Sequence, residues 1–598
     1  MKTRRGVSTV QVAIAVVVIV VLVGAGAYLA LTPAPGPSGS STTSPSTVST
    51  TITTTALKTV TVSTSNSSTQ SGVTPHTAVI QRNAPISNLD PRATSAIEIT
   101  QQIYETLTYV TPNGTIVAGL AVSWTPNANF TSWQYALRQG VKFHDGRVFN
   151  ATDVVFSIKN TKAFGQGDAP DVWPTLKDAV ATGPYSVTLT ATQPTNMPQV
   201  TAAAYQAAIF SHNVVKQSGV TDNTSSLAKW FNAPHGDGTG PYVLNASASS
   251  FSAGQVVLNR FPDYWGGWKN GQITDVIYKV VTNVDTAVQL ALKGQLDIIG
   301  ISGQFQYVPQ LLSAGLQVKS GPSFAAIWLL FNNQHQYLNN TLVRRALLTA
   351  IDFNQVINQA FYGYGTPFGG IINPGKAFYD PTAPAYGPKP NATAAKALLK
   401  QAGYPGGLNA TWTVTYSLGS PFEGTIAQLL QTFWAPLGVT LNIQGMSFTQ
   451  QAIKAGYVDS KGTPFSPGNI SYASTNKAQD LALLNWVGTT ADPWLVPTNL
   501  FAIQSPPYQD KIEFNWSYWR NQTFTDLLNK ARIDEVLNPT LAAQEFRTLN
   551  LMFYQAAPGH ALFASDQVWV LSPHLQGYVP NPYYGFDFWF FYKMTYQP

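Results

Sequence analysis

From about Thr77 onward, apolar residues recur along the chain with the spacings of short strands and amphipathic helices. Alternating or continuous apolar runs predict strands at Thr77–Gln81, Trp133–Leu137, Ser186–Thr192 and Ile327–Phe331. Glycine and proline, 46 and 40 residues, separate these runs and mark the turns between them. The pattern predicts a mixed α/β protein without internal repeats.

Helical spacing of apolar residues predicts helices at Ala96–Thr108, Leu342–Phe361 and Asn391–Lys400. Asn391 is a favourable N-cap for the third of these, and Gly403 follows its last turn, where glycine commonly ends a helix. With 598 residues, the chain is too long for one hydrophobic core. We therefore expect its elements to build several domains or lobes.

The first 31 residues have the pattern of a membrane signal. A basic cluster, MKTRRG, precedes an uncharged apolar run, Val10–Leu31. As a helix this run is about 33 Å long, enough to cross a bilayer with its N-terminus inside. The order of basic cluster, Gly6 and apolar run resembles the prepilin-type signals of archaeal surface proteins, which are cut after the glycine and keep the helix as an anchor. A secretory signal cleaved near Ala25–Ala27 is the alternative.

Residues 32–76 lack the apolar side chains that a folded domain needs. From Ser38 to Ser71, 23 of 34 residues are Ser or Thr, which predicts a disordered, O-glycosylated stalk. N-glycosylation sequons recur along the whole chain, at Asn66, Asn113, Asn129, Asn150, Asn223, Asn245, Asn339, Asn391, Asn409, Asn469, Asn515 and Asn521. Anchor, stalk and sequons together predict a glycoprotein whose globular part lies outside the cell, tethered to the cytoplasmic membrane.

Charge is sparse and nearly balanced in the globular part. The net charge of +6 comes largely from Lys2, Arg4, Arg5 and Lys58, and without them 30 basic residues face 28 acidic ones. This balance gives no support to nucleic-acid binding. Only 10% of residues are charged, which suits a surface facing an acidic medium, where carboxylates lose their charge.

The chain shows none of the local motifs of common enzymes or metal sites. It has no cysteine, and its seven histidines include no pair at metal-ligand spacing. A nucleophile elbow, a P-loop and a zinc-protease motif are all missing. We interpret His144, in the sequence HDG, as a turn residue and GDGTGP (Gly236–Pro241) as a bend. We therefore predict a protein that is not an enzyme and binds no cofactor or metal, with a surface glycoside hydrolase as a remote alternative.

Several segments resemble one protein family. The sequences IVAGLAVSW and WQYALRQGVKFHDGRVFNATDVVFSIKN, within Ile116–Asn160, are similar to the signature region of extracellular solute-binding proteins of the peptide/nickel/oligosaccharide class, the capture subunits of ABC importers. Further similar segments follow in the family's order at Leu89–Leu107, Gly238–Leu244, Val256–Gly267, Leu290–Ile298, Arg344–Ile357, Ala395–Tyr404 and Leu575–Tyr578. The resemblance covers the chain from Ala78 to its C-terminus.

This resemblance implies a bilobal binding-protein fold of the type II, three-subdomain kind. Residues 77–300 would form lobe I with an extra subdomain, residues 301–565 lobe II, and residues 566–598 would return to lobe I. A small-molecule ligand would bind between the lobes and be buried by hinge closure. The protein would act as a monomer that delivers this ligand to ABC permease subunits in the membrane.

The segment LNWVGTTADPW (Leu484–Trp494) bears on the ligand's chemistry. In peptide-binding members of the resembling family, the corresponding segment is a strand followed by a loop, and an aspartate in that loop binds the ligand's α-ammonium group. When Trp486 is aligned with the family tryptophan, Thr489 occupies the position of that aspartate. We interpret the next carboxylate along the chain, Asp492, as a turn cap. A pocket without the anion favours a neutral oligosaccharide, which packs its C–H faces on aromatic rings and its hydroxyls on polar groups.

For this ligand we predict two groups of contacts. Trp486 and Trp494 would supply ring faces, and Asn485, Thr489 and Thr490 polar partners. The family resemblance adds further candidates, namely Trp328, Tyr416, Ser417, Gln101 and Tyr104. The alternatives are that each tryptophan belongs to the core, that the ligand is an oligopeptide, or that the protein is a purely structural surface protein.

Overall fold

The computed structural model describes residues 74–93, 96–165, 169–203, 206–219, 224–301, 303–387, 389–456, 468–475, 477–487, 492–503, 511–512, 514–584 and 590–598. All of them lie in one compact unit, Thr69–Pro598. The predicted anchor, Val10–Leu31, and nearly all of the predicted stalk fall outside these residues. Within the described ranges, no helix is both long and apolar enough to cross a membrane.

An eleven-stranded sheet runs through the unit. In spatial order its strands are β15 (Val439–Met446), β14 (Ala410–Ser417), β17 (Leu481–Val487), β12 (Gln317–Phe331), β19 (Gly559–Leu571), β11 (Ile298–Gly300), β1 (Thr77–Arg82), β10 (Asp275–Val280), β9 (Gln255–Arg260) and β8 (Tyr242–Leu244), with β13 (Gly365–Thr366) pairing on β19. We call the part that carries β1 and β8–β11 lobe I, and the part that carries β14, β15 and β17 lobe II.

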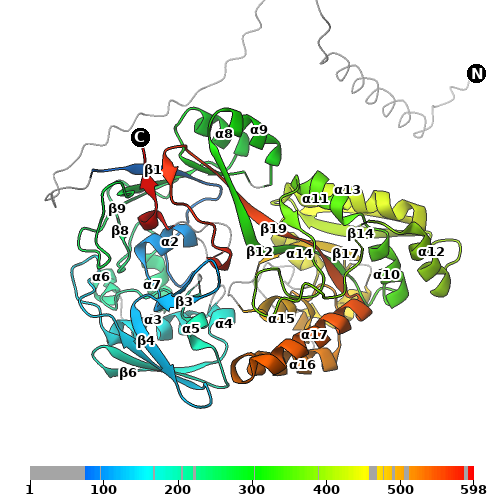
Figure 1. The fold of residues 1–598 in the computed structure, drawn as a ribbon, viewed down its shortest axis with the longest axis horizontal. Helices are drawn as coiled ribbons and strands as arrows, with labels where there is room; N and C mark the ends of the chain where they lie inside the picture. The colour runs from blue at the N-terminus through cyan, green and yellow to red at the C-terminus, as the bar shows by residue number, and fades with distance from the viewer. Residues whose placement is uncertain are drawn as a thin grey trace, which may run out of the picture. The chain divides into compact units, whose positions relative to one another are not determined.

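The long strands β12 and β19 connect the two lobes, as Figure 1 shows. Their antiparallel register shifts between Pro322 and Ala325, and Phe324 there has a φ of +57°, which is uncommon for a bulky residue. Such a bulge bends a strand pair and interrupts its hydrogen-bond ladder. The bulge therefore lies where the strand pair passes from one lobe to the other.

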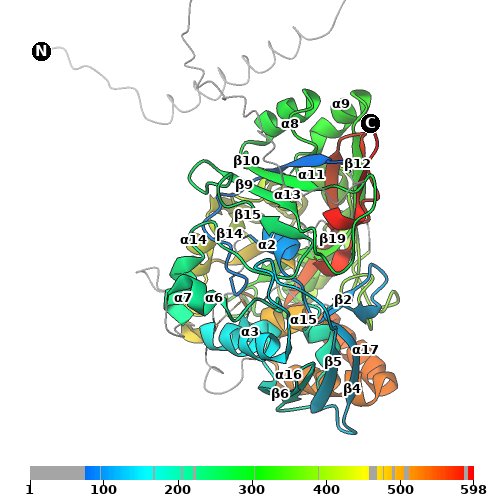
Figure 2. The ribbon, with the colours of Figure 1, turned by 90° about the vertical axis from the view of Figure 1, so that its left-hand side faces the viewer.

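Lobe I also contains a smaller sheet, ordered β4 (Ala121–Pro126), β5 (Ser132–Leu137), β7 (Ser186–Ala191) and β6 (Leu176–Gly183). Helix α3 (Ala151–Phe164) packs on it and begins with a capping box formed by Asn150 and Asp153. Figure 2 shows this sheet at the opposite end of the unit from α8 (Val284–Leu292) and α9 (Val308–Ser313). This sheet has its own apolar core, so it forms a subdomain of lobe I.

Both faces of the sheet in lobe II are covered by helices. Along β12, Ile327 and Leu329 point into one core and Trp328 and Leu330 into the other. The first core is built by α10 (Thr341–Thr349), α11 (Phe353–Phe361), α12 (Ala392–Gln401) and α13 (Pro421–Trp434), and the second by α14 (Phe448–Lys454), α15 (Leu495–Phe501), α16 (Gln522–Leu537) and α17 (Pro539–Ala556). Burial on both faces explains the unbroken apolar run of this strand.

The structure confirms several predicted elements and corrects others. The predicted strands at Thr77, Trp133 and Ser186 correspond to β1, β5 and β7, and Asn391 caps α12 by accepting a hydrogen bond from the backbone of Ala394. The helix predicted from Ala96 to Thr108 is shorter, since α2 (Ile97–Ile103) ends where Tyr104 is extended.

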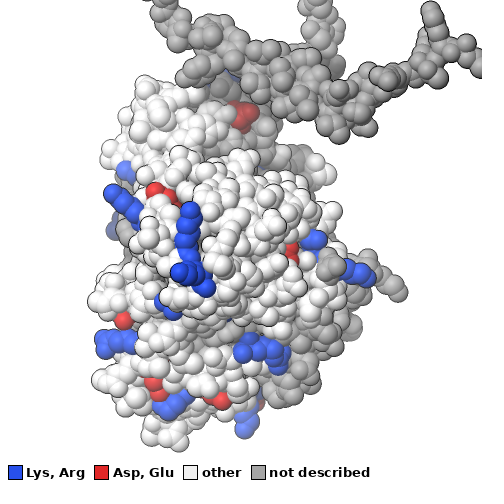
Figure 3. Space-filling model, turned by 90° about the vertical axis from the view of Figure 1, so that its right-hand side faces the viewer, with Lys and Arg blue, Asp and Glu red and all other residues white. Residues whose placement is uncertain are grey.

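The helix predicted at Leu342–Phe361 is two helices, because the side chain of Asp352 caps a second one by accepting from the backbone of Gln355. Both helices still present their apolar face to the same core. The low charge of the sequence is also visible in the folded unit. Figure 3 shows a face of mostly uncharged atoms with isolated basic and acidic side chains.

Candidate functional site

The parallel strands of both lobes end at edges that face the bulge in β12 and β19. In lobe I, β11 runs antiparallel to β19, with Gly300 opposite Trp569, so its carboxyl end points toward the bulge. In lobe II, the carboxyl end of β17 pairs with Ala325, on the other side of the same bulge. Because β1 is parallel to β11 and β14 is parallel to β17, each lobe turns its carboxyl edge toward the crossing. Ligands of α/β proteins bind at such edges.

Four of the predicted residues lie at the edge of lobe II. Tyr416 and Ser417 are the last residues of β14, and Asn485 and Trp486 lie near the end of β17. Neighbouring residues of a strand point to opposite faces, and here Trp486 packs against Phe514 at a ring distance of 4.3 Å, on the face away from α13. By this alternation, the side chains of Tyr416 and Asn485 lie on the face of the sheet that α13 covers, and those of Ser417 and Trp486 lie on the other face.

A buried acid, Glu423, completes this cluster and was not predicted. It lies in the first turn of α13 and is 1% exposed. Its Oε2 accepts a hydrogen bond from the backbone N–H of Ser417 at 2.8 Å. Burial raises the pKa of Glu423 to about 8, while the backbone of Ser417, the backbone of Asn485 and the side chain of Ser420 lower it. Among the described residues its Oε1 has no hydrogen-bond partner.

The predicted residues of lobe I, Gln101 and Tyr104, line one small cavity. This cavity has a volume of about 20 Å³, enough for a single water molecule. Gln101 Oε1 and the Tyr104 hydroxyl are buried there, and neither forms a hydrogen bond within the described part of the chain. The GDGTGP bend packs directly on this helix end, since a Cβ on Gly238 would lie 2.1 Å from the Ile103 carbonyl oxygen.

A larger cavity of about 450 Å³ lies beside it, still within lobe I. Glu105, 2% exposed, lines it and accepts hydrogen bonds from Trp265 and Thr239 at 2.9 Å and from Tyr264 at 3.0 Å. Burial raises the pKa of Glu105 to about 7, and these donors lower it. Because its oxygens are already engaged, Glu105 fixes the cavity wall rather than offering a free acceptor.

Trp494 lies where the two lobes touch. It is 7% exposed, and the Arg532 guanidinium lies 3.8 Å from its ring centroid. Next to it, Asp492 Oδ1 accepts a hydrogen bond from Gln199 Nε2 of lobe I at 3.0 Å, and Lys376 Nζ donates to the Asp492 carbonyl oxygen at 3.2 Å. Asp492, which the sequence suggested as a turn cap, thus joins the lobes.

The remaining predicted residues are placed as follows. Trp328 is fully buried and packs against Phe368, Phe501 and Phe553. It therefore belongs to the core of lobe II. Thr489 and Thr490 lie outside the described residues. No sequence motif marks Glu423, Glu105 or Gln199, because their roles arise from burial and from contacts between distant segments.

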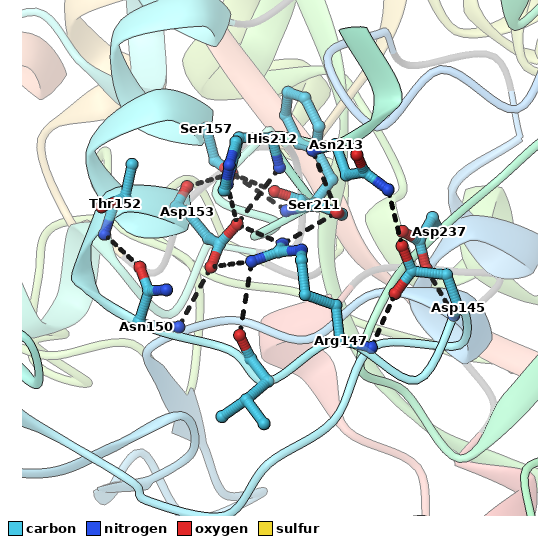
Figure 4. A network of polar contacts seen from close by, with 12 residues as sticks. Asp145, Arg147, Asn150, Thr152, Asp153, Ser157, Ser211, His212, Asn213 and Asp237 are labelled. Atoms are coloured by element: carbon cyan, nitrogen blue, oxygen red, sulfur yellow. Dashed lines mark hydrogen bonds and ion pairs between the residues drawn. The ribbon is translucent and has the colours of Figure 1, made fainter. Parts of the chain in front are cut away.

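A dense polar network in lobe I is structural. Figure 4 shows the fully buried Asp153 accepting from Arg147, from His212 Nδ1 at 2.7 Å and from the backbone of Asn150. Burial lowers the pKa of His144 to about 4, and the ring instead contacts the Gly240 carbonyl oxygen at 2.9 Å. In the described ranges, no group of three His, Cys, Asp or Glu side chains is arranged to hold a metal ion.

Comparison with known proteins agrees with this architecture. The model of the family described as bacterial extracellular solute-binding proteins, family 5 Middle, matches residues 115–505. The glutathione-binding protein GsiB of Salmonella typhimurium is 25% identical over 476 residues, which cover 78% of this chain and 84% of GsiB.

Two solved structures show the same bilobal fold. The periplasmic binding protein DppA from Helicobacter pylori, in complex with the peptide STSA, has a TM-score of 0.68 and 22% identity, covering 88% of this chain and 98% of DppA. The dipeptide-binding protein from Pseudoalteromonas sp. SM9913, in complex with Met-Leu, has a TM-score of 0.69 and 20% identity, covering 87% of this chain and 100% of its own. The chain belongs to family 5 of the extracellular solute-binding proteins, the substrate-binding components of ABC importers.

Proposed function

We propose that this protein captures short peptides outside the cell and delivers them to an ABC permease. The observation that carries this proposal is the family match over residues 115–505, together with relatives whose names or bound ligands are glutathione and short peptides. The oligosaccharide favoured by the sequence alone has no counterpart among these relatives. Its main argument, a binding edge without an acid, is also weakened by Glu423 at the edge of lobe II.

The geometry supports capture by closure of the lobes. Carboxyl edges face the crossing from both sides, the crossing strands carry a bulge, and Gln199 and Asp492 form a hydrogen bond between the lobes. A ligand that contacts both edges would stabilise the arrangement in which this bond is made. We further propose that the apolar run Val10–Leu31 tethers the protein and that the Ser/Thr-rich segment holds the lobes away from the membrane.

A thermal-shift screen of the full-length protein tests this proposal. Di- to pentapeptides, glutathione and di- to tetrasaccharides are added separately, and the melting temperature is followed as a function of ligand concentration. A ligand that binds only the folded state raises the melting temperature in a saturable way. We expect this rise with peptides. A saturable rise with saccharides and none with peptides would overturn the proposal, and chemical conversion of the ligand would indicate a hydrolase.

A further inference from the structure

We propose that closure of the two lobes is linked to the uptake of one proton by Glu535, so that the closed arrangement becomes more populated as the medium becomes more acidic. Glu535 lies in α16 of lobe II, beside the place where Asp492 bonds to lobe I. The inference goes beyond the proposed function, because it concerns the lobes themselves and holds for any ligand that the closed arrangement captures.

A small cavity at the contact between the lobes brings two acids together. Asp492 and Glu535 line it from lobe II, together with Trp494 and Arg532. Lobe I contributes seven lining residues, within 172–175 and 194–200, and all of them are uncharged. The volume of about 20 Å³ leaves space for one water molecule. Lobe I therefore takes part in shielding both carboxyl groups from bulk water.

The two acids differ in their hydrogen bonds. Asp492 Oδ1 accepts from Gln199 Nε2 of lobe I at 3.0 Å, and a donor of this kind favours the charged form of a carboxyl group. Glu535 Oε2 is buried and accepts no hydrogen bond from the described residues. A buried acceptor without a donor is unfavourable, and a second carboxylate nearby disfavours the charged form further. The proton therefore belongs on Glu535 when the lobes are closed.

The charged groups around Glu535 agree with this assignment. Burial and the negative charge of Asp492 raise the pKa of Glu535 well above its usual range, against the opposing effects of the Trp494 indole and of Arg532. The Arg532 guanidinium stacks on the Trp494 ring, and Lys376 Nζ donates to the backbone carbonyl oxygen of Asp492 at 3.2 Å. These two positive charges do not outweigh burial and the second acid.

Other charged side chains of α16, and of the helix α17 that packs on it, lie away from the cavity. Lys530 pairs with Asp534 of the same helix and with Glu545 of α17. None of these three lines the cavity or affects the pKa of Glu535. Of the acids in α16, which the structure describes throughout, only Glu535 lines the cavity. Closure of the lobes therefore acts on this acid and not on its helical neighbours.

The direction of the linkage follows from the pKa of Glu535 in the two arrangements. When the lobes separate, water reaches the carboxyl group and its pKa returns toward the ordinary value of 4.5. At pH values between this value and the higher pKa of the closed arrangement, closure takes up a proton. The advantage of closure is complete below about pH 4.5 and is lost as the pH rises through the higher pKa. One proton changes the ratio of closed to open molecules by about tenfold per pH unit at most.

Single-molecule fluorescence energy transfer in the full-length protein, without ligand, tests the inference. The chain has no cysteine, so dyes can be attached specifically to Ala181→Cys and Asn529→Cys, at exposed positions of β6 in lobe I and of α16 in lobe II. We expect the ratio of closed to open molecules to rise by about tenfold or more between about pH 7.5 and about pH 5. In Glu535→Gln, whose side chain cannot lose a proton, the ratio should be high and equal at both pH values. The control Asp526→Asn, which removes an exposed acid from the same helix, should keep the pH dependence.

The outcomes are independent of the proposed function, because no ligand is added. A ratio that does not change with pH in the unmodified protein overturns the inference, and so does a pH dependence that Glu535→Gln retains. Asp492→Asn serves as a second variant where Glu535→Gln does not fold. It should weaken the pH dependence, because Glu535 keeps its charge more readily beside a neutral neighbour. A full pH dependence in Asp492→Asn would show that another group takes up the proton.

Discussion

Replacing Gln199 by alanine should weaken ligand binding without unfolding the protein. Gln199 lies at the surface of lobe I in α5 (Met197–Val200), and its Nε2 donates to Asp492 Oδ1 of lobe II at 3.0 Å. Asp492 is 4% exposed, so its carboxylate is largely shielded from water. The bond joins residues 293 positions apart and exists only while the two lobes are in contact.

The size of the effect follows from the chemistry of this bond. A hydrogen bond to a charged group contributes about 1.5–3 kcal/mol, and the lower end applies because Gln199 is half-buried. If ligand binds the closed arrangement, the apparent affinity scales with the fraction of closed protein. A loss of about 1.5 kcal/mol then corresponds to about tenfold weaker binding.

Calorimetric titration with a peptide that binds the unmodified protein measures this change. Thermal unfolding without ligand checks that Gln199→Ala remains folded. Gln134→Ala is a matched control, because Gln134 donates to Ser186 at 3.4 Å within lobe I and does not reach lobe II. Unchanged affinity for Gln199→Ala, or an equal loss for Gln134→Ala, would refute a role for this contact in lobe closure.

Three further predictions concern stability, each measured as the free energy of unfolding in denaturant. Asp153→Asn should destabilise the protein by about 3 kcal/mol, because it breaks a buried ion pair. Lys142→Ala, which breaks an exposed ion pair, should destabilise it by less than about 1 kcal/mol. Equal losses for the two variants would contradict this contrast. Burial raises the pKa of Glu105 and of Asp237 to about 7, so the folded state binds more protons than the unfolded state, and stability should fall as pH rises from 4.5 to 7. A protein more stable at pH 8 than at pH 5 would argue against these shifts. Trp328→Ala should destabilise by about 3–5 kcal/mol, as expected for a buried aromatic side chain, and a loss below 1 kcal/mol would show that Trp328 is not core.

The sequence predicted features that depend on neighbouring residues. Asn391 caps a helix because its side chain reaches a backbone N–H three residues on, and the apolar run of β12 requires burial on both faces. Asp352 carries the same kind of signal, yet the continuous apolar spacing around it led us to predict one helix instead of two. Neighbouring residues therefore predicted whether a segment is a helix or a strand better than they predicted where it begins and ends.

Features that depend on contacts between residues far apart in the sequence could not be predicted from the sequence. Trp328 and Trp486 lie in strands that pair with each other, but one is fully buried and the other only partly, which the sequence does not reveal. Glu423 is separated from Asn485 by 62 positions along the chain, and only the pairing of β14 with β17 brings them together. The role of Asp492 likewise depends on a residue of the other lobe.

Native mass spectrometry of the full-length protein with a leucine-initiated tetrapeptide tests the central claim most directly. The account predicts one peptide bound per chain and recovered unchanged after release. Retention of an oligosaccharide in place of the peptide, or release of peptide fragments, would contradict it.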